Sequence, residues 1–163
     1  MIKVAIITVS DKGARGQRED ISGETIKFIL EKIEAKVVEY KIVPDEIDMI
    51  QQAIIKAVDS AKVDLVLTTG GTGLSVRDVT PDATMAVIDK LVPGISEIIR
   101  MESFQKTPKA ILSRAIAGIR KRSLIINLPG SPKGVRESLN VILEALPHGI
   151  DILKGDASEC GKE

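Results

Sequence analysis

Histidine, cysteine and aromatic residues are almost missing from this sequence. Its 163 residues include one histidine (His148), one cysteine (Cys160), no tryptophan, one tyrosine and two phenylalanines. A lone cysteine cannot form a disulfide within the chain, and one cysteine with one histidine is too few for a Cys/His zinc site. Catalysis centred on histidine is therefore not expected.

The chain also lacks a net charge and a long apolar run. Its 23 basic and 23 acidic residues balance, and few aromatic side chains are available to stack on bases, so we expect no nucleic-acid partner. No stretch approaches the roughly 18 apolar residues of a membrane span. The opening segment MIKVAIITVS lacks the basic part and the cleavage site of a signal peptide. We therefore expect a cytoplasmic protein without a membrane segment.

The remaining composition is that of an ordinary globular protein. Hydrophobic residues make up 44% of the chain and charged residues 28%, and the length suits one domain with its own core. No repeat or linker divides the sequence. We expect a single α/β domain over residues 1–155 and a flexible tail over residues 156–163.

Strand and helix patterns alternate along most of the chain. Aliphatic and β-branched runs predict strands at residues 2–9, 36–43 and 63–69, and a hairpin or two neighbouring strands within residues 115–128. Apolar residues at helical spacing predict helices capped by Ser22, over residues 46–61, from Thr80 to about Leu91, over 95–104 and, as one helix, from Pro132 through Leu146. This alternation favours a three-layer fold, in which a mostly parallel sheet carries helices on both faces.

Ligands of such sheets bind beyond the carboxyl ends of the strands. One loop in that place is TTGGTG, residues 68–73. Its glycines allow backbone N–H groups to approach an anion closely, as in phosphate-binding loops. No Gly-Lys-Ser/Thr follows, and Val76 stands where a dinucleotide fingerprint has its third glycine. The loop is thus either a phosphate cradle or a tight turn between strand and helix.

Two aspartates lie in neighbouring loops. Asp78 precedes the expected helix cap Thr80, so its carboxylate is available to a metal ion, although a solvated loop aspartate is the alternative. Asp45 is either a second ligand or the cap of the helix that begins at Glu46. Asp82, in a first helical turn, is interpreted as structural because it offsets the helix dipole.

A third loop, NLPGSPKG at residues 127–134, places Lys133 in the first turn of a helix. The helix dipole disfavours a cation there, and a bound anion would remove that conflict, whereas a solvent-directed lysine costs at most about 1 kcal/mol. Together these loops suit a phosphate-rich ligand and Mg²⁺, because phosphoryl and nucleotidyl transfer need positioning and charge neutralisation more than a protein base.

Longer motifs make the sequence resemble a known family. TVSD at 8–11, VPDE at 43–46, VLTTGGTGLSVRDVTPDAT at 66–84, ILSRAIAGI at 111–119, LIINLPGSPKG at 124–134 and LPHGIDIL at 146–153 are similar to the MoaB/Mog family of molybdenum-cofactor proteins. The resemblance covers essentially the whole chain and is greatest for the molybdopterin adenylyltransferase members, which include the G domain of gephyrin.

The resemblance implies Mg²⁺-dependent transfer of AMP from ATP to the terminal phosphate of molybdopterin, with release of pyrophosphate. It also implies a homotrimer, with hexamers in some members, and a separate molybdenum insertion protein that uses the product downstream.

Site residues follow from the same match. The resemblance assigns Asp45 and Asp78 to catalysis and to the metal. The other residues that it places at the site are Ser113, which we count with the catalytic residues, and the ligand-binding Ser10, Asp11, Gly70, Gly71, Thr72, Gly73, Asn127, Pro129, Gly130, Ser131 and Lys133. Arg77, Arg114 and Lys133 are the cations that could neutralise phosphate charge.

Two alternatives remain at this point. One branch of the family keeps the fold but departs at VPDE and RDVTPDAT, and a member of that branch would bind molybdopterin without catalysis. Both aspartates stand in this sequence, which favours the active branch. A nucleotide-processing enzyme of the competence-damage type is the other alternative, and the short chain counts against it.

Overall fold

The fold is built on a sheet whose strands are mostly parallel. The computed structural model describes residues 1–155, and in this part the sheet has six strands in the order β2-β1-β3-β6-β5-β4. The strands are β1 (Ile2–Val9), β2 (Ala35–Val43), β3 (Leu65–Thr69), β4 (Lys90–Leu91), β5 (Ala117–Arg120) and β6 (Ser123–Leu128). The first four strands in the spatial order run parallel. β5 pairs antiparallel with β6, and β4 pairs antiparallel with β5. The predicted fold class is confirmed.

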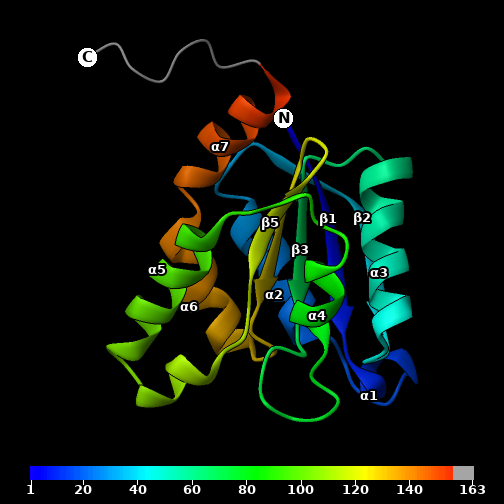
Figure 1. Ribbon diagram of the computed structural model, residues 1–163, viewed down its shortest axis with the longest axis vertical. Coiled ribbons are helices and arrows are strands. Elements are labelled where there is room, and N and C mark those ends of the chain that lie inside the picture. The colour runs from blue at the N-terminus through cyan, green and yellow to red at the C-terminus, as the bar shows by residue number, and fades with distance from the viewer. Residues whose placement is uncertain (156–163) are drawn as a thin grey trace.

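Helices cover both faces of this sheet (Figure 1). They are α1 (Asp11–Ala14), α2 (Ile21–Leu30), α3 (Ile47–Ile55), continued by a π-helical turn over Lys56–Ser60, α4 (Thr80–Met85), α5 (Pro93–Phe104), a 3₁₀ turn over Pro108–Leu112, α6 (Pro132–Ile142) and α7 (Ala145–Lys154). One apolar cluster joins the sheet to α2, α5, α6 and α7, and a second joins the opposite face to α3 and α4. Burial on both faces explains why β1 and β3 read as continuous aliphatic runs.

The helix expected from Thr80 to about Leu91 is shorter in the structure. It ends at Met85, and Lys90–Leu91 form the edge strand β4. The N–H groups of Asp89 and Val92 donate to carbonyl oxygens of Ile119 and Ala117, so pairing with β5 outweighs the helical pattern there. Pro93 is the first residue of α5, a position where the missing N–H of proline costs no helical hydrogen bond.

Helix starts differ from three predicted caps. Asp20, not Ser22, caps α2 by accepting a hydrogen bond from the Gly23 N–H at 2.9 Å. Asp45 does not cap α3, because Glu46 stands at the cap position and forms no side-chain cap hydrogen bond. Thr80 lies inside α4 rather than before it. Each predicted cap forms a longer-range hydrogen bond instead.

The region after residue 131 contains two helices rather than one. Ser131 caps α6 by accepting from the Gly134 N–H, as the sequence indicates, but the chain turns between Ile142 and Ala145. The expected flexible tail of residues 156–163, with Cys160, lies outside the described residues. No helix among residues 1–155 is long and apolar enough to cross a membrane.

Candidate functional site

The candidate site lies where the carboxyl ends of β1, β3 and β6 meet. A cavity of about 510 Å³ opens there. Of the residues that the sequence assigned to the site, those that line the cavity are Ser10, Asp45, Gly70, Gly71, Gly130 and Ser131. These residues come from four separate segments of the chain, and the parallel strands bring them to one edge.

Gly70 and Gly71 line the cavity and begin the glycine loop, which we define as residues 70–79. Gly70 (φ 98°) and Gly71 (φ 66°) both have left-handed backbone conformations. A Cβ atom at Gly70 would lie 2.4 Å from the Val9 carbonyl oxygen, and one at Gly71 would lie 2.4 Å from Thr80 Oγ1. Both positions therefore need glycine for backbone conformation and for close approach.

Two hydrogen bonds fix the base of this loop. The Gly70 N–H donates to the Leu128 carbonyl at the end of β6. The Thr80 hydroxyl donates to the Gly70 carbonyl at 2.8 Å, so Thr80 ties α4 to the loop instead of capping the helix. These hydrogen bonds give the base of the loop a fixed conformation.

Asp45 and Asp11 join the ends of β2 and β1 through a reciprocal pair. The Asp11 N–H donates to Asp45 Oδ2 at 2.9 Å, and the Asp45 N–H donates to Asp11 Oδ1 at 3.0 Å. Burial raises the pKa of Asp45, and the negative charges of Asp11 and Asp78 raise it further against the opposing hydrogen bond from the Asp11 N–H. Asp45 Oδ1 faces Gly71, 3.2 Å from the position of a Cβ there.

Arg77 pairs with acids of two other segments of the chain. Its Nε and Nη2 donate to the two carboxylate oxygens of Asp11 at 2.8 and 2.9 Å, and Nη2 also donates to Glu46 at 2.8 Å. This hydrogen bonding, with that from the Asp45 N–H, lowers the pKa of Asp11. Arg77 thus joins the glycine loop to the segments that hold Asp11 and Asp45.

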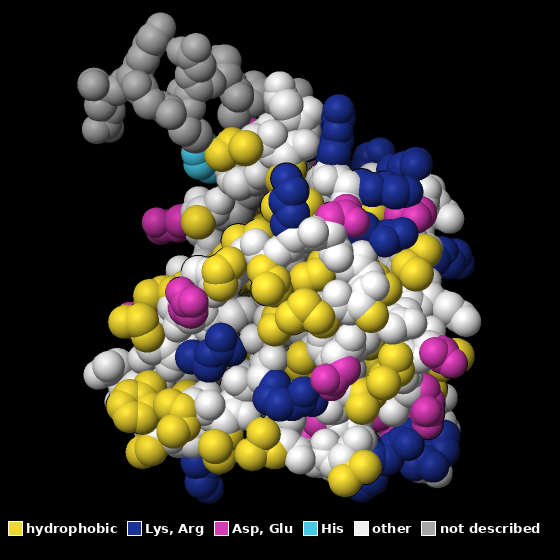
Figure 2. Space-filling model, viewed as in Figure 1, with side chains coloured by type: hydrophobic (Ala, Val, Ile, Leu, Met, Phe, Trp, Pro, Cys, Tyr) yellow, Lys and Arg dark blue, Asp and Glu magenta, His cyan; other side chains and the backbone are white. Residues whose placement is uncertain are grey.

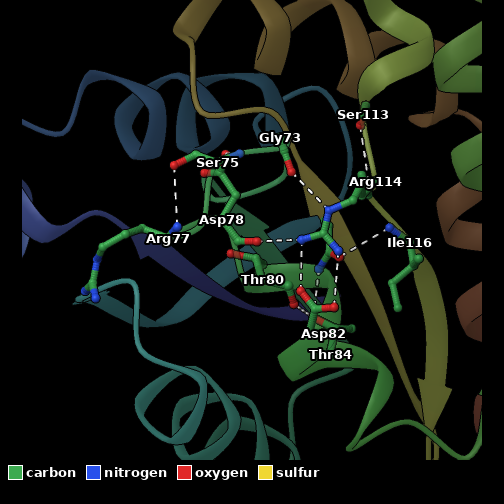
Figure 3. A network of polar contacts seen from close by, with 12 residues as sticks. Gly73, Ser75, Arg77, Asp78, Thr80, Asp82, Thr84, Ser113, Arg114 and Ile116 are labelled. Carbon is green, nitrogen blue, oxygen red and sulfur yellow. Dashed lines mark hydrogen bonds and ion pairs between the residues drawn. The ribbon is translucent and has the colours of Figure 1, made fainter.

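Asp78 folds back on the glycine loop (Figure 3). Its Oδ2 accepts from the Ser75 N–H at 2.9 Å and lies 2.9 Å from the position of a Cβ at Gly73. Asp78 is not among the residues that line the cavity of about 510 Å³. Its charge nevertheless reaches Asp45, whose pKa it raises.

Arg114 has contacts that the sequence did not indicate. Its backbone N–H donates to the Thr72 carbonyl at 2.9 Å. Its guanidinium donates to the carbonyls of Gly73 and Asp78 and, with two nitrogens, to the carboxylate of Asp82 (Figure 3). Asp82 therefore pairs with Arg114 besides lying in the first turn of α4.

The donor set suits a magnesium ion that also binds substrate oxygens. Among residues 1–155, no three or more His, Cys, Asp or Glu residues converge on a metal position. The two carboxylates of Asp45 and Asp78 lie beside Gly71 and Gly73 of one loop. Magnesium in such sites typically has one or two carboxylate ligands and completes its shell with water and phosphate oxygens. A cation near Asp45 would also offset the charge repulsion that raises its pKa.

Several other predicted residues lie around the cavity rather than in its lining. Asn127 is buried, and its amide donates to Thr68 and Thr84 and accepts from the Ile116 N–H. Ser113 Oγ accepts from the Ala115 N–H.

Beside the cavity, the Pro129 carbonyl accepts from the Thr69 hydroxyl, and Lys133 is exposed in the first turn of α6. Thr72 and Gly73 belong to the part of the glycine loop that contacts Arg114.

The sequence reasoning missed one wall of the cavity. Arg18, Glu19, Asp20 and Ser22 line it. The Asp20 carboxylate accepts from the Thr8 and Tyr40 hydroxyls, and the Ser22 hydroxyl donates to the Gly130 carbonyl at 2.8 Å. The polar stretch before α2 indicated a loop, but these pairings depend on β1, β2 and the segment before α6, so no local sequence pattern predicts them.

Known proteins are similar to this chain over most of its length. Residues 5–148 match the model of a family described as "Probable molybdopterin binding domain". The molybdopterin adenylyltransferase of Helicobacter pylori strain J99 is 45% identical over 157 residues, which cover 95% of this chain and 89% of that protein. The molybdopterin adenylyltransferase of Escherichia coli strain K12 is 37% identical over 184 residues, which cover 99% and 90%.

A solved structure gives the same result. The molybdopterin biosynthesis enzyme MoaB of Thermus thermophilus superposes with a TM-score of 0.91 at 48% identity, over 95% of this chain and 98% of that one. The family model spans more than half of the chain and includes the glycine loop, Asp45 and Asp78. This protein therefore belongs to the family of molybdopterin-binding domains of molybdenum cofactor biosynthesis.

Proposed function

We propose that this protein is a molybdopterin adenylyltransferase, which transfers AMP from ATP to the terminal phosphate of molybdopterin. An oxygen of that phosphate forms the new bond to the α-phosphorus of ATP, the bond from the α-phosphorus to the bridging oxygen of the β-phosphate breaks, and pyrophosphate leaves. The observation that carries the proposal is the placement of Asp45 and Asp78. These residues are far apart in sequence and lie against Gly71 and Gly73 of one loop.

The chain needs no general base for this reaction. A phosphate monoester has its second pKa near 6 and is mostly a dianion at neutral pH, so the attacking oxygen is already deprotonated. The scarcity of histidine and cysteine agrees with that requirement. The difficulty is to bring two phosphate groups together, because both are negative.

Backbone groups of two segments can meet that requirement. The glycine loop and the N-terminus of the 11-residue helix α6, at Gly130 and Ser131, both border the cavity. A helix N-terminus presents N–H donors and the positive end of its dipole to an anion. We propose that these donors bind phosphate groups, with Lys133 and Arg77 as nearby side-chain cations.

Asp45 and Asp78 are the residues that would hold Mg²⁺. When bound, the ion neutralises phosphate charge and aligns the attacking and leaving oxygens. Ser113 and Asn127 were expected in the pterin and nucleotide region, Ser113 as a catalytic residue and Asn127 as a ligand-binding one. We keep Ser113 as a predicted catalytic residue of that region. The buried amide of Asn127 is proposed to support the site by joining β3, α4 and the segment before β5.

A homotrimer in the cytoplasm is the proposed assembly, with a hexamer as an alternative. Apolar side chains gather on the surface over α5 and the following 3₁₀ turn (Figure 2). These elements carry the exposed Met101, Phe104, Ile111 and Leu112, and an exposed apolar patch indicates a protein contact. The product would pass to a separate molybdenum insertion protein.

The test is a reconstitution with purified protein, molybdopterin, ATP and Mg²⁺, read by chromatography of the pterin and by pyrophosphate release. We expect both products from the wild-type protein and from Asp151→Asn, an exposed aspartate on α7. Asp45→Asn and Asp78→Asn should form neither while still binding molybdopterin. Tight binding of molybdopterin by the wild-type protein without ATP consumption would replace the enzyme by the non-catalytic alternative.

A further inference from the structure

Arg114 contacts both ends of the part of the glycine loop that leads to Asp78. Its Nε donates to the Gly73 carbonyl at 3.0 Å and its Nη2 to the Asp78 carbonyl at 2.5 Å. The Arg114 guanidinium thus bridges the first and last residues of the segment from Gly73 to Asp78, as Figure 3 shows. The Arg114 N–H adds a third tie, to the Thr72 carbonyl.

Asp82 fixes the plane of that guanidinium. Its two carboxylate oxygens accept from Nη1 at 3.1 Å and from Nη2 at 2.9 Å. A bidentate pair holds a planar group in one orientation, which a lysine ammonium cannot reproduce. Since Asp82 lies in the first turn of α4, the orientation of Arg114 is set by a rigid element.

Arg114 contacts the backbone of Asp78 and not its carboxylate. The carboxylate is held separately by the Ser75 N–H. Three guanidinium nitrogens donate to Gly73, Asp78 and Asp82, so the contacts that Arg114 forms hold the loop and the first turn of α4. Arg77, on the same loop, differs in that its guanidinium pairs with acids of other segments, Asp11 and Glu46.

We propose that Arg114 is a positioning residue, which together with Asp82 holds the backbone of the glycine loop so that the Asp78 carboxylate stays against Gly73. This inference rests on the proposed function for its effect on rate, but its structural part does not. Loss of the bridge leaves Asp78 chemically intact and lets its backbone move away from Asp45. The consequence is a lower turnover rate and a need for more Mg²⁺, with molybdopterin binding retained.

Arg120 offers a matched control. It also forms a bidentate pair with an aspartate, Asp59, and donates to a carbonyl, that of Val87. It lies at the end of β5 that leads into the turn to β6, away from the residues that line the cavity. Arg120→Lys removes the same kind of pair without touching the glycine loop.

The experiment compares Arg114→Lys, Asp82→Asn and Arg120→Lys with the wild type. Loss of a group that orients a metal ligand typically lowers activity by about 10–100-fold. We expect such a fall in kcat for Arg114→Lys and a smaller one for Asp82→Asn, a higher Mg²⁺ concentration at half-maximal rate, and an unchanged molybdopterin Kd. Methylguanidinium should restore part of the kcat of Arg114→Ala, and Arg120→Lys should keep the wild-type rate.

Two results would overturn the inference. One is an equal loss of rate in Arg114→Lys and Arg120→Lys. The other is a molybdopterin Kd that rises as much as the rate falls, which would make Arg114 a substrate contact. Amide hydrogen exchange gives a readout independent of catalysis, since residues 73–79 should exchange faster in Arg114→Lys than in Arg120→Lys. An inactive wild type that shows this difference would reject the proposed function and retain the positioning role.

Discussion

Two arginine–aspartate pairs of the same chemistry involve arginines just before β5 and at its last residue. Arg114–Asp82 precedes the strand and Arg120–Asp59 ends it. Both are bidentate, and both arginines also donate to backbone carbonyls. The difference lies in which carbonyls accept. Arg114 holds the loop that carries Asp78, whereas Arg120 joins Val87, after α4, to Asp59 in the π-helical turn.

Residue type alone therefore does not show whether an arginine–aspartate pair holds the candidate site or another part of the fold. The first pair is expected to control the rate through the glycine loop, and the second only the stability of one end of the sheet. Substitutions around the first pair should therefore change activity, and substitutions around the second should change unfolding. Four predictions test this division, from the largest expected effect to the smallest.

Asp78→Asn should lower the rate most. If Asp78 holds Mg²⁺ as proposed, its loss removes several kcal/mol of charge stabilisation, which corresponds to about 1,000-fold in kcat. The amide oxygen can still accept from the Ser75 N–H, so the unfolding temperature should stay unchanged. Asp89→Asn is the control, because Asp89 accepts from the Lys121 N–H in a similar way near the second pair. Comparable rate losses in both variants would contradict the division between a first pair that controls the rate and a second pair that affects only stability.

Gly71→Ala should damage both rate and stability. Its φ of 66° disfavours a side chain, and the new Cβ would lie 2.4 Å from Thr80 Oγ1. We expect a destabilisation of about 1–3 kcal/mol and a strong loss of activity. Denaturant unfolding and the product assay measure the two effects.

Gly149→Ala serves as its control. Gly149 lies in α7 with open space around the position of a Cβ, so this change should stabilise the protein by about 0.5–1 kcal/mol and leave the rate alone. A Gly71→Ala protein as stable and active as the wild type would show that the loop has no fixed shape.

Asn127→Ala should act mainly on stability. The substitution removes the acceptor of the part-buried Ile116 N–H and the donor to the buried hydroxyls of Thr68 and Thr84, at a cost of about 1–3 kcal/mol. Asn140→Ala, which removes an exposed contact to Lys32, should change stability by less than about 0.5 kcal/mol. Denaturant midpoints decide the matter, and equal midpoints for the two variants would contradict the supporting role of Asn127.

The smallest effect concerns pH and the second pair. Arg120 and Lys121 lower the pKa of Asp59 to about 2. A carboxyl with a depressed folded-state pKa stabilises the protein above its unfolded value, near 4, and loses that contribution as pH falls through the folded value. The unfolding temperature of the wild type should therefore exceed that of Asp59→Asn at about pH 5, and the two should converge toward about pH 2. A constant difference across this range would remove Asp59 as the titrating group.

Much of the fold could be predicted from the sequence because its signals are local. The aliphatic runs of β1 and β3 and the Ser131 cap of α6 depend on neighbouring residues only. β4 could not be predicted, since it exists only through pairing with β5. The role of Thr80 could not be predicted for the same reason, because its hydroxyl donates to the carbonyl of Gly70, ten positions earlier.

The candidate site divides in the same way. Glycines and aspartates in strand-end loops indicated where phosphate and metal chemistry could lie, and the structure places Asp45, Gly70 and Gly71 at one cavity. The guanidinium of Arg114 and the amide nitrogen of Asn127 have partners that lie 30 or more residues away, and no sequence pattern indicated them. The candidate phosphate and metal ligands could be predicted from residue types, whereas the side chains that hold them in place became known only from the tertiary contacts.

Transfer of the α-phosphorus is the most direct test of the proposed function. ATP labelled at the α-phosphate and ATP labelled at the γ-phosphate are each incubated with Mg²⁺, molybdopterin and the wild-type protein. Adenylyl transfer predicts that the α-label appears in the pterin product and the γ-label in pyrophosphate, with neither in Asp78→Asn. A γ-label in the pterin product, or wild-type protein that binds molybdopterin and leaves both labels in ATP, would contradict the account.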